Sequence, residues 1–213
     1  MGDHAAGQLR RQRKETGTVV QKWRRVDTEG GPRFRSSLEP HEAALLRNLA
    51  GSILDMLDER ESDSPPDELE QITGMRTGNS SPPRDDTTRR LLPDFYRFQP
   101  TAGSPIDAAE LNSALRSLHE PAIIDAKRSA AQQLIDTTPQ QGGRLALTDD
   151  QANAWVAAVN DIRLALGTIL NIGPEGPDRL GPEHPMAVQL NVYQWLTTLQ
   201  EYLVIALMRK PRR

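Results

Sequence analysis

Apolar residues recur at intervals of three and four along three long stretches of the chain, which is the spacing that puts them on one face of an α-helix. The first predicted helix runs from about Glu39 to Arg60, the second from Asp149 to Ile172, and the third from about Pro185 to Arg209. Thr148 and Gln151 form a capping-box pattern at the start of the second helix. Because a short loop joins the second and third helices, we expect an antiparallel pair at the centre of a helical bundle.

The stretch from about Ile106 to Thr137 also has a helical pattern, but it contains Pro121. Proline lacks the backbone N–H that a helix interior uses, and its ring clashes with the preceding turn. We therefore expect Pro121 to divide this region. A further short helix is predicted at about Pro66 to Thr73, and residues 74–88, which are rich in Gly, Ser, Pro and Asp, are predicted to form a mobile loop.

Ahead of the first helix the pattern changes to an alternation of two, which is typical of strands. Two such runs flank the turn-rich segment Asp27–Gly31, so a β-hairpin is predicted over residues 18–37. Alternation places Trp23 and Phe34 on the face that would anchor the hairpin to the helices, and we expect the arginines to face water.

The fold class predicted from these patterns is mainly α, a helical bundle of about five helices with a small N-terminal β-hairpin. We expect a disordered basic extension at residues 1–17, followed by a single helical domain over residues 18–210. Only 4% of the residues are aromatic. A core of Leu, Ile, Val and Ala favours helices over sheets, since strands prefer aromatic and β-branched residues.

The net charge of −3 hides an uneven distribution. Residues 1–35 hold nine Lys or Arg against four Asp or Glu, so this front is basic and the rest of the chain is acidic. Such an arrangement is typical of an arm that seeks DNA or an acidic partner, although a solvated tail and an ordinary charged hairpin face remain an alternative. The candidate contact residues are Lys22, Arg24, Arg25, Arg33 and Arg35.

Three of the nine aromatic residues of the chain fall within residues 89–98. This segment is expected either to pack across the helices as an ordered loop or to dock a partner. The candidate docking residues are Phe95, Tyr96 and Phe98.

The sequence contains no pattern that predicts catalysis. The absence of cysteine excludes disulfides, thiolate metal sites and a cysteine nucleophile within the chain. No two of the four histidines have the i,i+4 spacing of a helical zinc site, and no GxGxxG, P-loop or GxSxG motif occurs. We therefore expect no catalytic site, no metal and no cofactor. A polar groove for a small ligand, with Asn153, Asn160 and Arg163 on the second long helix, is kept as an alternative.

Nothing in the sequence indicates a membrane protein. The first residues are polar and carry no apolar core of a signal peptide, and the apolar run at residues 203–208 is far too short to span a bilayer. The lack of cysteine fits a reducing compartment. We therefore expect a cytoplasmic protein.

Four segments together resemble an actinobacterial family catalogued as a domain of unknown function, whose members include the AosR proteins, or actinomycete oxidative stress regulators. The resemblance covers residues 20–207, and its segments read KWRRVDTEGGPRFRSSLEPHEAALLRNLAG (22–51), RRLLPDFYR (89–97), LHEPAIIDAKR (118–128) and NVYQWLTTLQEYLV (191–204). These segments are specific to the family but carry no chemical signature.

The resemblance implies a transcriptional co-regulator that works with an extracytoplasmic-function sigma factor on cysteine-biosynthesis genes under oxidative stress. The basic residues of the hairpin would contact either the phosphates of promoter DNA or an acidic face of the sigma factor. A protein adaptor linked to ClpS and Clp proteolysis is the second hypothesis, and a small-ligand-binding bundle is the third. Because this chain has no cysteine, any thiol that senses an oxidant must belong to a partner. Oxidation of methionine in this chain is the alternative, with Met56, Met75, Met186 and Met208 as candidates. The oligomeric state stays open.

Overall fold

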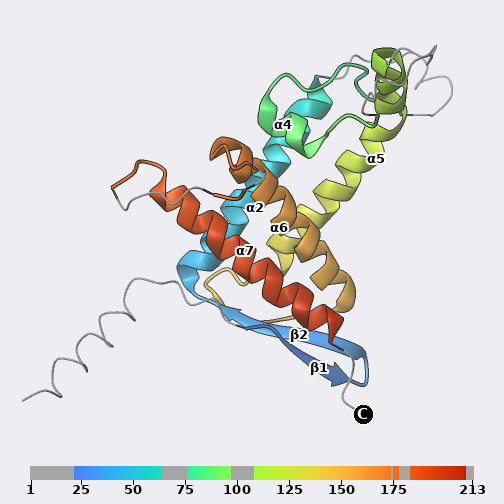
Figure 1. Cartoon of the computed structure of the whole chain (residues 1–213). Helices are drawn as coiled ribbons and strands as arrows, with labels where there is room; N and C mark the ends of the chain where they lie inside the picture. The colour runs from blue at the N-terminus through green and yellow to red at the C-terminus, as the bar shows by residue number, and fades with distance from the viewer. Residues whose placement is uncertain (1–21, 64–75, 97–107, 174, 178–182, 210–213) are drawn as a thin grey trace, which may run out of the picture.

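The computed structural model describes residues 22–63, 76–96, 108–173, 175–177 and 183–209. These residues hold five helices and three strands, and the mainly α fold with a small β-element is confirmed (Figure 1). In chain order the elements are β1 Arg24–Thr28, β2 Gly31–Leu38, α2 Pro40–Ser62, α4 Asp86–Leu91, α5 Ala108–Thr137, β3 Gly143–Leu147, α6 Asp149–Ile169 and α7 Ala187–Met208.

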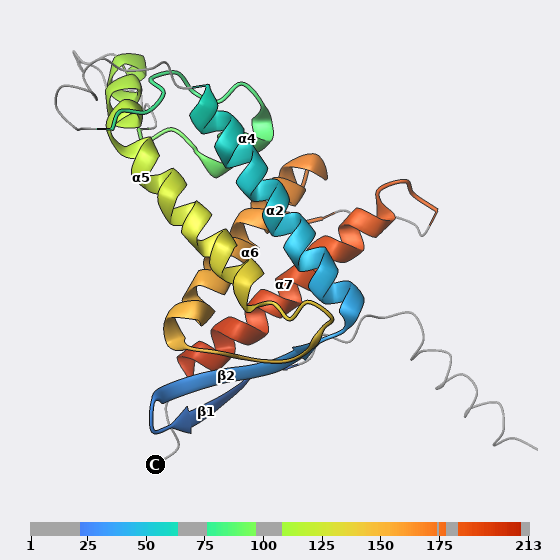
Figure 2. The same cartoon turned by 180° about the vertical axis from the view of Figure 1, so that it is seen from behind.

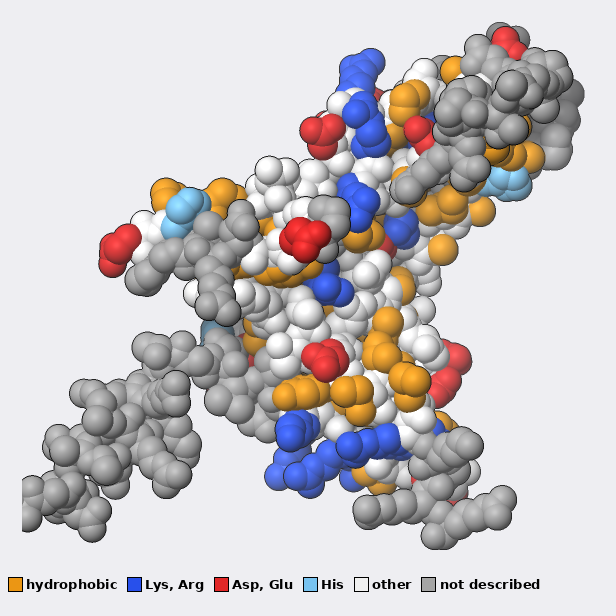
Figure 3. Space-filling view, in the orientation of Figure 1, with side chains coloured by type: hydrophobic (Ala, Val, Ile, Leu, Met, Phe, Trp, Pro, Cys, Tyr) orange, Lys and Arg blue, Asp and Glu red, His pale blue; other side chains and the backbone are white. Residues whose placement is uncertain are grey.

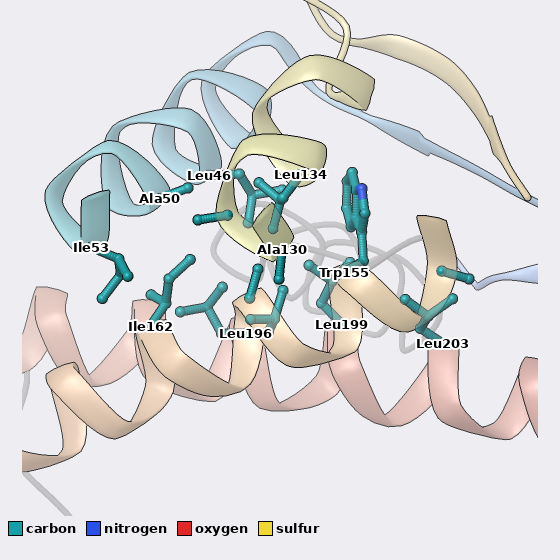
Figure 4. Close-up of a cluster of buried hydrophobic side chains, with 14 of the residues drawn as sticks. Leu46, Ala50, Ile53, Ala130, Leu134, Trp155, Ile162, Leu196, Leu199 and Leu203 are labelled. Carbon is teal, nitrogen blue, oxygen red and sulfur yellow. The ribbon is translucent and has the colours of Figure 1, made fainter. Parts of the chain in front are cut away.

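The four long helices α2, α5, α6 and α7 surround one hydrophobic core, with α6 in contact with each of the other three (Figures 1 and 2). Leu46, Leu134, Trp155 and Leu199, which come from these four helices, are buried in the same cluster (Figure 4). The predicted antiparallel pairing of α6 with α7 is confirmed, since earlier residues of α6 bond to later residues of α7. The burial of these large apolar side chains is the main source of fold stability.

Local sequence determines where two of these helices begin. At α6 the predicted capping box is confirmed, because the Thr148 hydroxyl accepts from the Gln151 N–H at 3.2 Å and the Gln151 side chain accepts from the Thr148 N–H at 2.9 Å. A second capping box opens α2, where the Glu42 carboxylate accepts from the Glu39 N–H at 2.8 Å. The same carboxylate accepts from Trp195 Nε1 at 3.1 Å, so it also fastens α7 to the start of α2.

The predicted hairpin is present as β1 and β2, and Trp23 and Phe34 are buried as expected. The edge of Trp23 meets Trp155 of α6, with ring centroids 5.5 Å apart. The sheet also has a third strand, β3, which pairs antiparallel with β2 in the order β1-β2-β3. The sequence patterns did not predict this third strand. Gly142 lets the chain turn into β3 beside the end of β2. Only glycine suits this position, because its φ is +71° and a Cβ there would lie 2.7 Å from the Leu38 carbonyl oxygen.

The prediction that Pro121 divides its region is wrong, because α5 continues through it from Ala108 to Thr137. A proline at this position leaves the carbonyl of Ser117 without its helical donor. Gly78, far away in the sequence, donates its backbone N–H to that carbonyl at 2.8 Å. Its lack of a side chain is required, because a Cβ would lie 2.9 Å from Pro121 Cδ.

The mobile loop predicted at residues 74–88 overlaps the short helix α4, and its mobility stays a prediction. Residues 76–85 have irregular backbone but make specific contacts, and the short helix α4 begins at Asp86. The Asp85 carboxylate caps α4 by accepting from the Thr88 N–H at 2.7 Å. The predicted extension at residues 1–17 and the short helix at Pro66–Thr73 lie outside the described residues.

Candidate functional site

The two faces of the sheet differ in character. Phe34 is fully buried toward the helices, so its neighbours Arg33 and Arg35 point away from them. Directly opposite residues of an antiparallel pair lie on the same face. Arg24 is opposite Arg35, and Arg144 is opposite Ser37, so both join the outward face. We call Arg24, Arg33, Arg35 and Arg144 the arginine face, and basic side chains gather over β1 and β2 in Figure 3.

No carboxylate of the described residues forms an ion pair with the arginine face, so its positive charge is not neutralised by them. Arg24, Arg35 and Arg144 are exposed and make no ion pair or hydrogen bond to any described residue. Arg33 donates only to neutral acceptors, the carbonyls of Gly30 and Pro32, at 3.4 and 3.2 Å. Guanidinium groups present fork-shaped pairs of N–H donors that match carboxylates and phosphates. The arginine face is therefore suited to bind an anionic surface.

Two of the predicted contact residues lie elsewhere. Arg25 points to the inner side of the sheet, where its Nε is 3.1 Å from Asp27 and its Nη1 donates to the Arg209 carbonyl at 2.9 Å, just after the end of α7. The Lys22 ammonium lies 5.9 Å from the centre of the Tyr202 ring of α7. The structure thus brings together Arg24, Arg33 and Arg35 but not Arg25 or Lys22. Arg144 was missed because β3 was missed, although the alternation of apolar residues in residues 143–147 carries the signal.

The aromatic segment is ordered as far as it is described. The backbone N–H and C=O of Tyr96 both bond to the side chain of Asn112, at 2.8 and 2.9 Å. The Phe95 ring lies 6.0 Å from the His119 ring and 5.9 Å from the Arg116 guanidinium. Phe95 and Tyr96 remain 37% and 38% exposed, so both rings are available to a partner. Phe98 lies outside the described residues.

A chain of ion pairs lies beneath this segment. Glu120, which is 1% exposed, bonds Arg60 at 2.7 Å with one carboxylate oxygen and Arg116 at 2.6 Å with the other. Arg116 also bonds the half-exposed Asp94 at 2.7 Å, and Arg60 donates to the Ser81 carbonyl. We call Arg60, Arg116, Glu120 and Asp94 the buried ion network. It joins α2, α5 and the irregular segments around α4, so its evident role is structural.

Of the three residues of the alternative polar groove on α6, only Arg163 lines a hollow in the structure. Arg163 lines a hollow of about 540 Å³ near α4 and α7, together with Arg90 and Tyr193. Asn153 donates to the Asp149 carbonyl within its own helix and Asn160 is exposed, and neither lines the hollow.

The described residues contain no group of three or more His, Asp or Glu placed to hold a metal ion. None of the helices in the described part of the chain is long and apolar enough to cross a membrane.

A family model described as a domain of unknown function (DUF2017) matches residues 20–207. The chain belongs to the DUF2017 family. Relatives named "Oxidative stress regulator AosR" from Mycobacterium bovis and Mycobacterium tuberculosis are each 63% identical to it over 200 residues, covering 91% of this chain and 90% of the relative. A Mycobacterium leprae relative is 59% identical over 202 residues, covering 92% of each chain. The resemblance to the AosR proteins is therefore confirmed, and no solved structure matches the chain.

Proposed function

We propose that this DUF2017 protein is a regulator of the oxidative-stress response that acts as a transcriptional co-regulator, together with an extracytoplasmic-function sigma factor, on cysteine-biosynthesis genes. The 63% identity to proteins named as oxidative stress regulators carries the regulatory part of this proposal. The arginine face supports the remaining part, because it is a surface fitted to DNA phosphates or to an acidic face of a protein partner.

The arginine face is well built for such contacts. Neighbouring strands lie about 4.8 Å apart and alternate residues of a strand about 6.8 Å apart, so its four arginines span several phosphates of a DNA backbone. The sheet that holds them is anchored by buried Phe34, so little backbone freedom is lost on binding. These guanidiniums also have no ion pair with any described residue that would be lost on binding.

The test measures the affinity for a labelled promoter duplex, with and without the sigma factor, over a range of salt concentrations. If all four arginines neutralise a phosphate, the slope of log affinity against log salt is about −3.6, since each phosphate contributes about −0.9. The double variant Arg24→Ala/Arg35→Ala is expected to halve this slope. The matched control is Arg84→Ala/Arg89→Ala, which removes the same charge at the opposite end of the molecule. Affinity that is independent of salt, or full binding by the Arg24/Arg35 variant, contradicts the role of the arginine face.

The lack of cysteine makes the proposal more specific, because the thiol that senses the oxidant is then supplied by the partner. In a mixing experiment, hydrogen peroxide treatment of the sigma factor alone should change complex formation. Treatment of this chain alone should leave complex formation unchanged. If complex formation responds only when this chain is treated, the assignment of the sensing thiol to the partner is contradicted.

An adaptor role in ClpS-linked proteolysis is the second candidate, and the exposed rings of Phe95 and Tyr96 favour it. It predicts protein partners that survive nuclease treatment in an affinity capture and are lost from the double variant Phe95→Ala/Tyr96→Ala. Loss of partners from the arginine variant alone favours the co-regulator instead.

A further inference from the structure

The hollow beside α6 is separate from the arginine face and from the aromatic segment. Its walls come from α4, α6, the residues that follow α6, and α7, and its volume of about 540 Å³ falls in the range of small-molecule sites. Charged and polar side chains line it at Arg90, Arg163 and Tyr193, and apolar ones at Leu164 and Ile172.

The charge of this hollow is strongly positive. Arg90 is exposed and bonds to no described residue. No Asp or Glu of the described residues lines the hollow. The carboxyl end of α6 contributes about half a negative charge. The two arginines exceed that by more than one unit, so the local excess of positive charge remains.

Arg163 is oriented by neutral groups rather than by a carboxylate. Its Nε donates to the Thr197 hydroxyl at 3.1 Å, one terminal nitrogen donates to the Gln200 amide oxygen, and the other lies 3.5 Å from the Tyr193 hydroxyl. The Tyr193 ring lies beneath the guanidinium, 5.4 Å away. A guanidinium has five N–H groups, so two remain after these three bonds. In contrast, the guanidiniums of Arg60 and Arg116 are paired with carboxylates.

We propose that this hollow binds a small organic anion. Its phosphate or carboxylate group lies between Arg90 and Arg163, where it also accepts the hydroxyl proton of Tyr193 in a hydrogen bond. The apolar remainder of the ligand packs against Leu164 and Ile172. The site is thus a ligand site on the regulator, independent of the arginine face that contacts DNA or a protein partner.

The test is a titration of the full chain at low ionic strength by isothermal calorimetry and by two-dimensional NMR of the amide groups. The probes are inorganic phosphate, pyrophosphate and citrate, and the comparison of pyrophosphate with citrate distinguishes a phosphate site from a carboxylate site. We expect saturable binding that shifts the amide signals of Gly167, Thr168 and Tyr193 and weakens as salt is added.

The Arg90→Ala variant should bind the preferred probe about tenfold more weakly, the usual cost of losing one charge-assisted hydrogen bond. Arg84→Ala is the matched control, because Arg84 is likewise exposed and does not line the hollow. Arg163→Gln should abolish binding of the probe, while its circular dichroism spectrum should remain that of the folded protein. If the Arg163→Gln variant unfolds, the comparison of Arg90→Ala with Arg84→Ala still decides whether the anion binds in this hollow.

The proposal is overturned if no probe saturates below about 10 mM, a Kd that corresponds to negligible affinity. It is also overturned if Arg84→Ala weakens binding as much as Arg90→Ala, which would indicate general charge attraction. The Arg90→Ala variant should leave the salt slope of DNA binding unchanged, so failure of the ligand site and failure of the co-regulator role are distinguishable.

Discussion

Arginines serve opposite purposes at the two ends of this molecule. In the buried ion network, Arg60 and Arg116 are 7% and 1% exposed, and both bond Glu120. In the arginine face, Arg24 and Arg35 lie directly opposite one another in the sheet, and neither forms an ion pair with a carboxylate of the described residues. The same side chain is thus a structural tie in one region and a free contact group in the other.

Burial explains the difference. A charge that leaves water loses several kcal/mol of solvation, so a buried arginine is tolerated only when a carboxylate and further acceptors surround it. An exposed arginine keeps its hydration and needs no partner. The comparison predicts large effects on stability in the buried ion network and small ones in the arginine face, with binding effects in the reverse order.

The largest effect is expected from Glu120→Gln. This change keeps the shape of the side chain but leaves Arg60 and Arg116 buried without their shared carboxylate. We expect the free energy of unfolding to fall by about 3–5 kcal/mol. Urea denaturation followed by circular dichroism measures it.

The matched control for that change is Asp94→Asn, which removes the half-exposed carboxylate at the end of the same network. Its cost should be no more than about 1 kcal/mol, as for other exposed pairs. Equal losses in the two variants would show that burial is not what separates the two classes of arginine.

The next largest effect is expected at Gly78, which packs against Pro121 of α5 and donates its backbone N–H to the Ser117 carbonyl. In Gly78→Ala the new Cβ meets Pro121, so the segment must shift and its bond to the Ser117 carbonyl weakens. We expect a loss of about 1–3 kcal/mol in the same denaturation experiment. Gly51→Ala is the control, because Gly51 lies within α2 with nothing near its Cβ, and it should stabilise the protein by about 0.5–1 kcal/mol. A neutral Gly78→Ala would contradict the tight contact.

These cases show how far the sequence could predict the structure. Apolar periodicity and the Thr148 capping box predicted α2, α6 and α7, because both signals are local in the chain. The continuity of α5 was not predictable in this way, since the donor that compensates Pro121 is Gly78, which is remote in sequence and was assigned to a mobile loop.

The candidate site was also predicted only in part, because local patterns specify some of its residues and tertiary contacts specify the others. Alternation identified Arg24, Arg33 and Arg35 as outward residues, and it also puts Arg25 on the inner side with Trp23, opposite Phe34. The partner of Arg25 there, the Arg209 carbonyl, is remote in sequence and was not predictable. Arg144 joins the arginine face through the pairing of β3 with β2, which no local pattern specifies. Arg90 and Arg163 meet at one hollow through tertiary packing alone.

The ion pair of Lys127 with Asp161 lies between the two classes of charged residue, because only one of its partners is buried. Lys127 bonds Asp161 at 2.6 Å, and Asp161 is nearly buried while Lys127 reaches solvent. Burial raises the pKa of the Asp161 carboxyl above its ordinary 3.8, although the hydrogen bond and charge of Lys127 act in the opposite direction. The folded state therefore holds this proton more tightly than the unfolded state, and stability falls as pH rises through the window between the two pKa values.

Asp161→Asn removes that cost of ionisation while an amide oxygen can still accept from Lys127. At pH 7 we expect its free energy of unfolding to equal that of the parent or to exceed it by up to about 1 kcal/mol. The advantage should shrink as pH falls below the window. Urea midpoints measured from pH 3.5 to pH 7 check both points, and a loss above about 2 kcal/mol at pH 7 would show that the pair stabilises the fold.

The smallest effect on stability is expected at the arginine face itself. Arg24→Thr removes one of two like charges that lie directly opposite each other, and threonine suits a strand. The free energy of unfolding should stay the same or rise by up to about 0.5 kcal/mol. Arg25→Thr, one residue along, instead loses the contacts with Asp27 and the Arg209 carbonyl and should cost up to about 1 kcal/mol. Only the first variant should lower the salt slope of DNA binding. If Arg24→Thr destabilises the fold more than Arg25→Thr, then Arg24 is a structural tie and the division between the two ends of the molecule fails.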